Sequence, residues 1–322
     1  MAKYDVICIG SATTDVFGEV NCLFSNVKCG DKVLINKIFF EDGGSAVNSS
    51  VALSRLGLKV GFLGKLGKDY RAKDIQNLLK KEKVHIINKN FSTHPTSYSF
   101  IADSSKECDR IIFAYKGASD DLQLRDIDWK IIKNTKWIYL GTMLGASFNT
   151  VKKLVIFAHK HKINILFNPS TYLAKKGKSY LKDILKYTTV LVLNLQEAQF
   201  VLKNQTNKIE LLSKALRKLG PKTIIITNGS NGAYLYDGKY LCHTNPYKVK
   251  VVSTTGAGDA FASGFLASYI KTKDLLLAIK IGMANAASVI TRIGAQNKLL
   301  TFKQALSFIK THKGKVDKWI CE

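Results

Sequence analysis

The stretch IELLSKALRKLGPKTIIIT, from Ile209 to Thr227, contains the pattern that decides the fold. Its first part has apolar residues at helical spacing, including Leu212 and Leu216, and Gly220 follows where such a helix ends. Its second part, TIIIT, is a continuous apolar run, which is typical of a strand buried on both faces. The stretch therefore predicts a helix that leads into a strand of a parallel sheet.

The same order recurs along the chain. Four further apolar runs are VICIG, WIYLG, INILFNP and VLVLN, which begin at Val6, Trp137, Ile163 and Val190. Helical patterns such as FNTVKKLVIFAHKHK (148–162) lie between most of them. Strand alternating with helix predicts a three-layer α/β fold, in which a mostly parallel central sheet carries helices on both faces.

Several of these runs end in a polar residue or a glycine. Ligands bind at the carboxyl ends of the strands in open α/β sheets, so these ends predict one shared cleft. The residues concerned are Gly141, Asn168, Asn194 and Thr227.

Two regions alternate with period two instead, which is typical of strands with one exposed face. DVFGEV and KVLINKIFF lie between Asp15 and Phe40, and TSYSFIADSSKECDRIIFAYKG (96–117) has the pattern of a hairpin. We expect these segments, about residues 12–40 and 95–117, to form a small four-stranded sheet, the lid, within a single domain of residues 1–322.

The lid also offers contacts to ligands and to other chains. Its candidates for substrate contact are Tyr98, Phe100, Arg110, Phe113 and Tyr115, of which alternation turns only some inward. So small a sheet cannot be covered on both faces by so little chain, which predicts a homodimer through the lid. Apolar residues expected near that exposed face or edge are Ile35, Phe39 and Ile111.

The charge of the chain admits a different class of function. The net charge is +25 over 322 residues, which is compatible with nucleic-acid binding. The basic residues are spread along the chain without a stripe or tail, however, which favours a solvated lysine-rich surface and no nucleic-acid partner. No apolar run could cross a bilayer and no secretory signal is evident, so we expect a cytoplasmic protein without a membrane partner.

Six cysteines occur without a Cys-x-x-Cys pair or a Cys/His cluster of zinc-site spacing, which favours reduced thiols. They are Cys8, Cys22, Cys29, Cys108, Cys242 and Cys321.

The stretch VVSTTGAGDAFASGF, Val251 to Phe265, places an acid after three small residues at the start of an apolar helical pattern. The free N–H groups and the dipole of a helix N-terminus attract anions, and glycine lets an oxygen approach the backbone. Asp259 fits a base that takes a proton from a hydroxyl, while the turn holds charge on a transferred phosphoryl group. The alternative is that Asp259 only caps the helix. The chain contains neither a Walker P-loop nor a Rossmann fingerprint after its first strand.

A second stretch, EDGGSAVNSSVALSRLG, Glu41 to Gly57, has two glycines before a predicted amphipathic helix. Asn48 lies one turn inside that helix, on the side where the glycine turn admits a ligand; alternatively, it is an incidental polar residue. In this order and at this separation, the two stretches resemble the two signature motifs of the PfkB (ribokinase-like) family of sugar and nucleoside kinases. The resemblance covers essentially the whole chain and implies a three-layer α/β fold with a small β lid.

On the acceptor side, the resemblance implies that Asp259 is the catalytic base. The backbone of three residues would form the anion hole: Gly256, Ala257 and Gly258. Four residues would bind the substrate: Asp15, Gly43, Gly44 and Asn48. Asp15 would hold hydroxyl groups of the substrate. Each has a structural alternative, such as a turn residue in the case of Asp15.

On the nucleotide side, NLQE matches the N-x-x-E pattern of the family, so Asn194 and Glu197 would organise Mg²⁺ and its water near the phosphates. TNGSNG matches the nucleotide loop, whose residues would line the ATP site: Thr227, Gly229 and Gly232. Asn285 would lie near the adenine or the ribose, unless it is a polar residue packed within a helix.

The resemblance implies an ATP- and Mg²⁺-dependent kinase that phosphorylates a hydroxymethyl group of a small sugar or sugar acid. A nucleoside kinase for adenosine, cytidine or inosine is the open alternative. Ribokinases proper carry a glutamate after the strand that reads WIYLG here, whereas TMLGASF follows in this chain and holds no carboxylate. This difference disfavours ribose.

Many relatives bind a monovalent cation beside the anion hole, and this chain departs from their pattern. Ser253 stands where an aspartate is usual, and Lys298 falls near the position of a second contact. We therefore expect activity without K⁺. One hypothesis is that the fixed charge of Lys298 replaces the ion; the alternative is a lysine that points to solvent.

Overall fold

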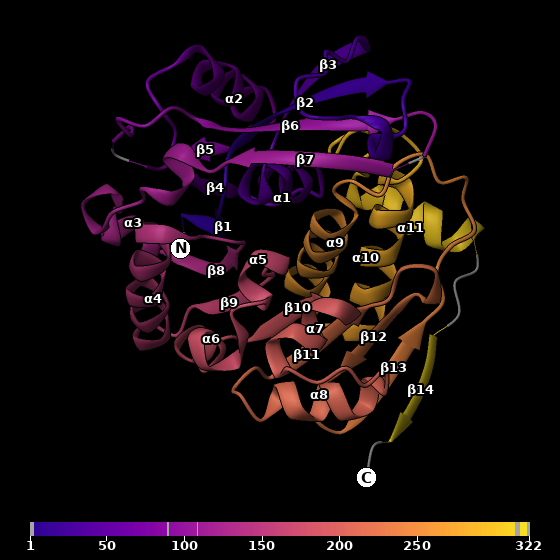
Figure 1. Ribbon diagram of the computed structural model, residues 1–322. Coiled ribbons are helices and arrows are strands. Elements are labelled where there is room, and N and C mark those ends of the chain that lie inside the picture. The colour runs from indigo at the N-terminus through magenta and orange to yellow at the C-terminus, as the bar shows by residue number, and fades with distance from the viewer. Residues whose placement is uncertain (1–2, 89, 108, 313–315, 321–322) are drawn as a thin grey trace.

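The structure, a computed structural model, describes residues 3–88, 90–107, 109–312 and 316–320. Within these ranges the chain forms a ten-stranded sheet and a four-stranded sheet (Figure 1). The strand order of the larger sheet is β14-β13-β12-β11-β10-β9-β8-β1-β4-β5. Its strands are β1 (Tyr4–Ile9), β4 (Val60–Leu63), β5 (His85–Ile86), β8 (Thr135–Leu140), β9 (Asn164–Phe167), β10 (Val190–Asn194), β11 (Thr223–Thr227), β12 (Ala233–Tyr236), β13 (Tyr240–Thr244) and β14 (Val316–Ile320).

The predicted parallel core is confirmed. From β5 to β11 every neighbouring pair of strands in this sheet runs parallel, and the interiors of the apolar runs are buried. Strand β1 lies between β4 and β8, so the chain builds the sheet outward from β1 in both directions. Such a switch point opens a crevice at the carboxyl ends of the strands. The antiparallel extension β12–β14 was not part of the prediction.

Helices cover both faces of the larger sheet, as predicted (Figure 1). One face carries α1 (Ser45–Arg55), α2 (Tyr70–Lys81), α9 (Ala257–Thr272), α10 (Leu275–Val289) and α11 (Phe302–Thr311). The opposite face carries α3 (Trp129–Lys133), α4 (Gly145–Lys160), α5 (Thr171–Ala174), α6 (Gly177–Leu185), α7 (Leu195–Leu202) and α8 (Ile209–Arg217). Short 3₁₀ turns occur at η1 (Phe24–Asn26), η2 (Gly117–Asp120), η3 (Leu124–Asp126) and η4 (Gly229–Asn231).

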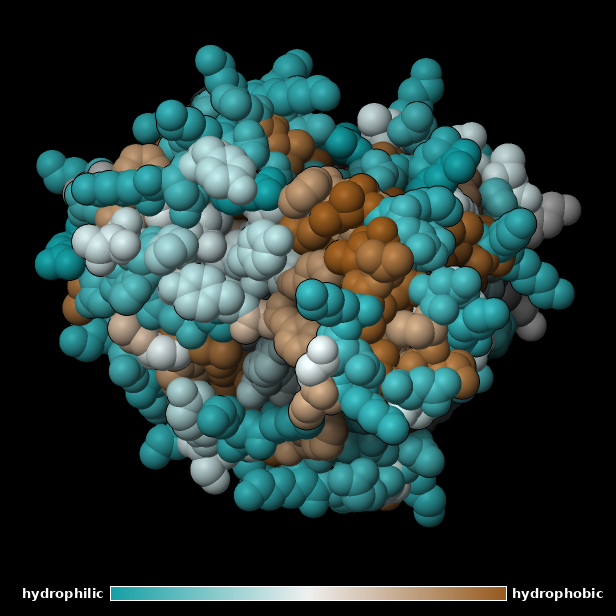
Figure 2. Space-filling model, turned by 45° about the horizontal axis from the view of Figure 1, so that its top comes forward, coloured by the Kyte–Doolittle hydropathy of each residue, from teal (hydrophilic) through white to brown (hydrophobic). Residues whose placement is uncertain are grey.

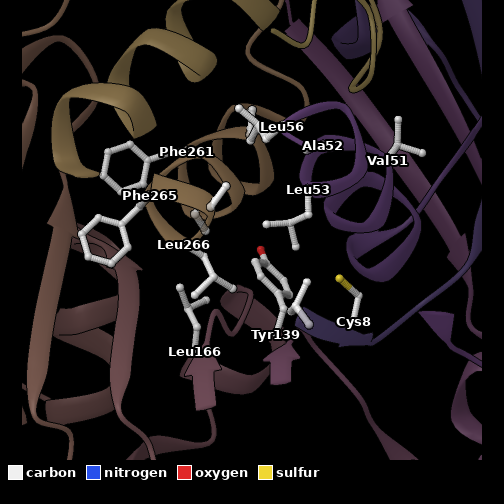
Figure 3. Close-up of a cluster of buried hydrophobic side chains, with 14 of the residues drawn as sticks. Cys8, Val51, Ala52, Leu53, Leu56, Tyr139, Leu166, Phe261, Phe265 and Leu266 are labelled. Carbon is white, nitrogen blue, oxygen red and sulfur yellow. The ribbon is translucent and has the colours of Figure 1, made fainter. Parts of the chain in front are cut away.

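The first of these faces holds the helices that bear the two motifs. In Figure 3, Leu53 of α1 and Leu266 of α9 converge above Leu166 and Tyr139 of the sheet. Helix α9 also packs closely on α10, because a Cβ atom at Gly264 would lie only 3.0 Å from the Cα atom of Gly282. This close packing fixes the position and direction of the N-terminus of α9.

The smaller sheet is the lid, in the order β3-β2-β6-β7. Its strands are β2 (Thr13–Val20), β3 (Ile35–Gly43), β6 (Ser97–Ser104) and β7 (Asp109–Tyr115), of which β6 and β7 form the predicted hairpin. Figure 1 shows the lid lying across one end of the larger sheet. Figure 2 turns that end forward, and hydrophobic side chains there gather in a patch bordered by hydrophilic ones.

Strand register decides which lid residues face inward. Asp15 and Glu19 lie on one face, and pairing of Glu19 through Asp103 places Arg110 on that face too. The other four candidates for substrate contact pair in register with Thr14 or Val16 and lie on the opposite, outer face: Tyr98, Phe100, Phe113 and Tyr115. As expected, alternation turns only some of the five candidates inward, and by this register Arg110 is the one that faces inward.

The same register sorts the apolar residues expected at a dimer contact. Ile35 and Ile111 are exposed, at 43% and 41%. Phe39 is not, because it lies on the inner face and stacks on Phe17 at 4.8 Å between ring centroids. Phe40 and Phe113 instead stand exposed on the outer face, with Val16 and Phe100 between them in the same cross-strand row.

In the part of the chain that the structure describes, no helix combines the length and the apolar character needed to span a membrane. Cys8, Cys22 and Cys29 are free thiols, and Cys108 and Cys321 lie outside the described residues.

Candidate active site

A cleft of about 340 Å³ opens at the carboxyl ends of the parallel strands. Residues at or just after five strand ends line it: Ser11, Thr142, Asn168, Asn194 and Thr227. The predicted shared cleft is thus confirmed. Gly141 lies just outside it and packs against Ser45 at the start of α1.

Asp259 lies at this cleft, in the first turn of α9. The Asn48 side-chain amide donates to one carboxylate oxygen of Asp259 at 3.0 Å, and the Tyr139 hydroxyl donates to the other at 3.5 Å. Burial raises the pKa of Asp259 to about 6, although both hydrogen bonds lower it. The carboxylate is therefore ionised at neutral pH and more basic than an ordinary aspartate, as a proton acceptor should be.

The turn before Asp259 requires glycine. Gly256 has φ of 76°, and a Cβ atom there would lie 2.5 Å from Ala295. The turn ends at the first residues of α9, whose N–H groups lack acceptors within the helix. Gly256 and Gly258 line the cleft, so an anion bound there would meet these N–H groups and the positive end of the helix dipole.

Two residues that the sequence analysis did not single out, Gln296 and Tyr139, hold Asn48 and Asp259 in place. Gln296 donates to the Asn48 side-chain oxygen at 3.1 Å and to the Asp42 carbonyl at 2.6 Å. The buried Tyr139 hydroxyl also contacts Asn168 at 3.1 Å. The available signal for Tyr139 is a hydroxyl inside the otherwise apolar run WIYLG. The sequence around Gln296 has no comparable feature, because its partner Asn48 lies 248 residues away in the chain.

The carboxylate of Asp15, on the lid, lies close to Gly43 and Asn48. A Cβ atom at Gly43 would lie 3.1 Å from the Asp15 carboxylate and 3.5 Å from the Asn48 side-chain oxygen. Gly44, with φ of 93°, then turns the chain into α1. Burial raises the pKa of Asp15 to about 6, against the lowering effects of the Ser99 hydrogen bond and the Lys116 charge. The structure thus brings together the predicted acceptor-side residues, from the lid sheet and from the starts of two helices, α1 and α9.

A second cavity of about 530 Å³ adjoins the cleft and shares Thr227 and Gly258 with it. Three predicted residues line only this cavity: Gly229, Gly232 and Ala257. Much of its remaining wall is apolar, with Tyr247, Val249, Phe261, Met283 and Ile290. An apolar cavity that ends at an anion-binding turn suits a flat aromatic base linked to phosphates.

Asn194 and Glu197 line the same cleft as Asp259 and hydrogen-bond to each other. The Asn194 N–H donates to Glu197 at 3.0 Å, and the Glu197 N–H donates to the Asn194 side chain at 2.8 Å. Thr171 donates to the other Glu197 oxygen at 3.3 Å. Both carboxylate oxygens of Glu197 already accept hydrogen bonds, so these residues fit an ion held through its water rather than by direct ligation.

Asn285 has the contacts of the alternative interpretation, a polar residue packed within a helix, and its place near the adenine or the ribose stays a prediction. It is fully buried, its amide donates to the Ala260 carbonyl at 2.8 Å, and its side-chain oxygen accepts from the Leu300 N–H at 3.0 Å. It therefore joins α9, α10 and the segment before α11. Its neighbours Ala286 and Ala287 line the second cavity, and Asn285 lies behind that wall.

The proposed replacement of a cation by Lys298 is not supported either. Lys298 is exposed and lines a separate hollow with Glu41 and Arg292, not the cleft of Asp259. The Ser253 hydroxyl donates to Thr255 at 3.2 Å, and Arg110 of the lid donates to the same Thr255 oxygen at 3.1 Å. The cationic side chain that reaches this turn therefore comes from the lid.

Comparison with known proteins gives concordant matches. The family model for pfkB family carbohydrate kinases matches residues 3–301. The 5-dehydro-2-deoxygluconokinase of Clostridium perfringens is 30% identical over 333 residues, covering 97% of this chain and 94% of the relative. The ribokinase of Thermotoga maritima has a TM-score of 0.83 at 23% identity, covering 95% of this chain and 99% of its own.

A nucleoside kinase of Methanocaldococcus jannaschii has a TM-score of 0.79 at 22% identity, covering 97% of this chain and 100% of its own. Kinases named for a sugar and for a nucleoside thus share this fold, and the fold alone does not separate the two acceptors.

Proposed function

Because this chain belongs to the pfkB family of carbohydrate kinases, we propose that it transfers the terminal phosphoryl group of ATP to a hydroxymethyl group of a small sugar acid. The family makes the chain an ATP-dependent sugar kinase. The sugar-acid acceptor is supported by the relatives named 5-dehydro-2-deoxygluconokinase, which match nearly the whole chain. The nucleoside kinase alternative has the support of fold alone.

The observation that carries this proposal is the position of Asp259 where two cavities meet. The hydroxyl of a sugar in the cleft would reach the carboxylate, and phosphates from the second cavity would reach the turn of Gly256 and Gly258. Asp259 takes the hydroxyl proton as the oxygen attacks phosphorus and the bond to the ADP oxygen breaks. The N–H groups at the start of α9 stabilise the charge on the phosphoryl group.

The remaining residues position the reactants. Asn48 holds the carboxylate of Asp259 at 3.0 Å, and Asp15 would accept hydrogen bonds from hydroxyl groups of the sugar. Asn194 and Glu197 would hold hydrated Mg²⁺, which neutralises phosphate charge when bound. A buried general base beside an anion-binding turn fits a reaction in which positioning and charge stabilisation supply most of the rate.

A coupled assay of ADP release tests the acceptor. The panel contains 5-dehydro-2-deoxygluconate, ribose, fructose, adenosine and cytidine, each with ATP and Mg²⁺. We expect the highest kcat/KM for the sugar acid. A higher value for adenosine or cytidine would replace this proposal with the nucleoside kinase alternative.

We also propose that the enzyme does not need K⁺. Position 253 offers a hydroxyl that is engaged with Thr255, instead of the carboxylate usual in the family, so the turn has less negative charge to hold a cation. Equal rates in sodium, potassium and tetramethylammonium buffers at one ionic strength are expected. Strong activation by K⁺ would contradict this.

We also propose that a second copy of this chain binds the outer face of the lid and so forms a homodimer, because apolar residues are exposed there. Ile38, Phe40 and Phe113 are 55%, 51% and 62% exposed, and a second copy of the same face would cover them. Light scattering at micromolar concentration is expected to give the mass of two chains. The mass of one chain would rule this contact out at that concentration. Location in the cytoplasm stays a prediction.

A further inference from the structure

The cleft contains a lysine that the proposed mechanism leaves without a task. Lys116 directly follows β7 and continues the alternation of Arg110 and Ala114, which places it on the same face of the lid as Asp15. It lines the cleft together with Asp259. Its side chain therefore faces the space in which the acceptor would bind.

Charge in the cleft makes this lysine conspicuous. Among the described residues that line the cleft, three are carboxylates, Asp120, Glu197 and Asp259, and Lys116 alone is cationic. A neutral sugar needs no cation in such a place, because its hydroxyl groups bind well to carboxylates. A sugar acid would be repelled by these carboxylates unless its own carboxylate met a positive charge.

The Lys116 ammonium is only weakly satisfied within the chain. It lies 4.6 Å from the centre of the Tyr172 ring, and no described carboxylate lies within ion-pair distance, 4.0 Å. Burial lowers the pKa of Lys116, while the charges of Asp120 and Asp15 act in the opposite direction. A desolvated ammonium with free donors gains most from an anionic ligand.

Lys65 shows what a structural lysine looks like in the same protein. Its ammonium lies 2.6 Å from the carboxylate of Asp126, and the two side chains are 3% and 0% exposed. That pair is closed to ligands and satisfied internally. Lys116 differs on both counts, since it borders the cleft and lacks such a partner.

We propose that Lys116 is the specificity residue that binds the carboxylate of a sugar-acid acceptor. This rests on the proposed function, and it explains how one cleft accepts an anion beside three acidic side chains. The phosphates of ATP are an alternative anion, but Lys116 does not line the second cavity, and the start of α9 already serves phosphate.

The test compares 5-dehydro-2-deoxygluconate with its carboxamide, which is neutral and nearly isosteric. We expect the unmodified enzyme to prefer the acid, and Lys116→Met to lose roughly 10- to 100-fold in kcat/KM with the acid, the range for a hydrogen bond to a charged group. The loss with the carboxamide should be smaller, so the preference for the acid collapses. Lys116→Arg should retain most of it.

Lys175→Met is the matched control. Lys175 also lies over an aromatic ring, 5.4 Å from the centre of Phe200, but it is exposed and does not line the cleft. It should leave the ratio of acid to carboxamide unchanged. Melting temperatures of all variants, with and without the acid, separate loss of binding from loss of folding.

Two results would overturn the role of Lys116. One is an equal loss with acid and carboxamide in a folded Lys116→Met variant. The other is a raised KM for ATP with the preference for the acid retained, which would assign the lysine to the nucleotide. Failure of the unmodified enzyme to release ADP with any acceptor would instead refute the proposed function.

Discussion

The two sheets differ in how their side chains are used. In the larger sheet, β10 and β11 are buried on both faces between helix layers, and the helix that carries Asp259 is buried from Ala260 to Ser268. In the lid, β7 is exposed from Arg110 to Tyr115. The base therefore stands on packed structure, while Asp15 and Lys116, which are proposed to contact the acceptor, stand on or beside a sheet with an exposed edge strand. Chemistry and specificity are thus divided between a stable region and a less constrained one.

The largest expected effect is on the packed side of this comparison. Asp259→Asn removes the base but preserves its shape, so we expect kcat to fall about 10²- to 10⁴-fold with nucleotide affinity retained. The variant should also stay folded. Burial raises the pKa of Asp259, so the unmodified protein loses stability as pH rises through about 6, and the melting temperature of the variant at pH 8 should be no lower. A variant with near-normal kcat would exclude Asp259 as the base.

The next largest effect is expected on the free energy of unfolding, when a buried phenylalanine of the core and an exposed one of the lid are each truncated. Phe265 of α9 is fully buried (Figure 3), and Phe265→Ala should cost about 3–5 kcal/mol in the free energy of unfolding. Phe113 of the lid is 62% exposed in the single chain, and Phe113→Ala should cost no more than about 0.5 kcal/mol when unfolding is measured at a concentration too low for two chains to associate. Urea unfolding of both variants measures the contrast. Equal costs would show that the lid is packed as tightly as the core.

The pH profile tests both regions at once, because each region supplies to the proposed reaction an acid whose pKa is raised to about 6. Asp259 and Asp15 both have a pKa of about 6 and act as carboxylates, so kcat/KM should fall at least about tenfold per unit below pH 6. Protonation on the acid side removes both the base and the acceptor for sugar hydroxyls. Asp15→Asn should make the fall less steep. A profile flat down to pH 5 would contradict the raised pKa values.

The smallest expected effect concerns the contact between the regions. Arg110 of the lid donates to Thr255 at 3.1 Å, just before the turn at Gly256. Arg110→Leu should lower kcat/KM about two- to tenfold, the value of one such hydrogen bond, and leave the melting temperature unchanged. Arg125→Leu, at an exposed position away from both cavities, is the control. An unaltered kcat/KM would mean that the lid and the turn act independently.

Prediction from sequence succeeded where a local pattern reports burial. The apolar runs at β10 and β11 and the amphipathic pattern of α4 fix which faces are buried, because hydrophobic spacing repeats with the period of the element. The turn at Gly256 and the acid after it were also recognisable, since a glycine turn at a helix start has few uses. The antiparallel strands β12 to β14 escaped notice because their runs are short and alternate less clearly.

The sequence by itself determined the layers, the lid and the nature of the acid at the start of α9. Only the tertiary structure decided that Asn48 meets Asp259 across 211 residues, that Asn285 is buried and links two helices, and that Lys116 faces the cleft. Burial follows from the local period of apolar residues, which any stretch displays on its own. The partners of a polar side chain depend on how distant elements pack and register, and no local pattern records that.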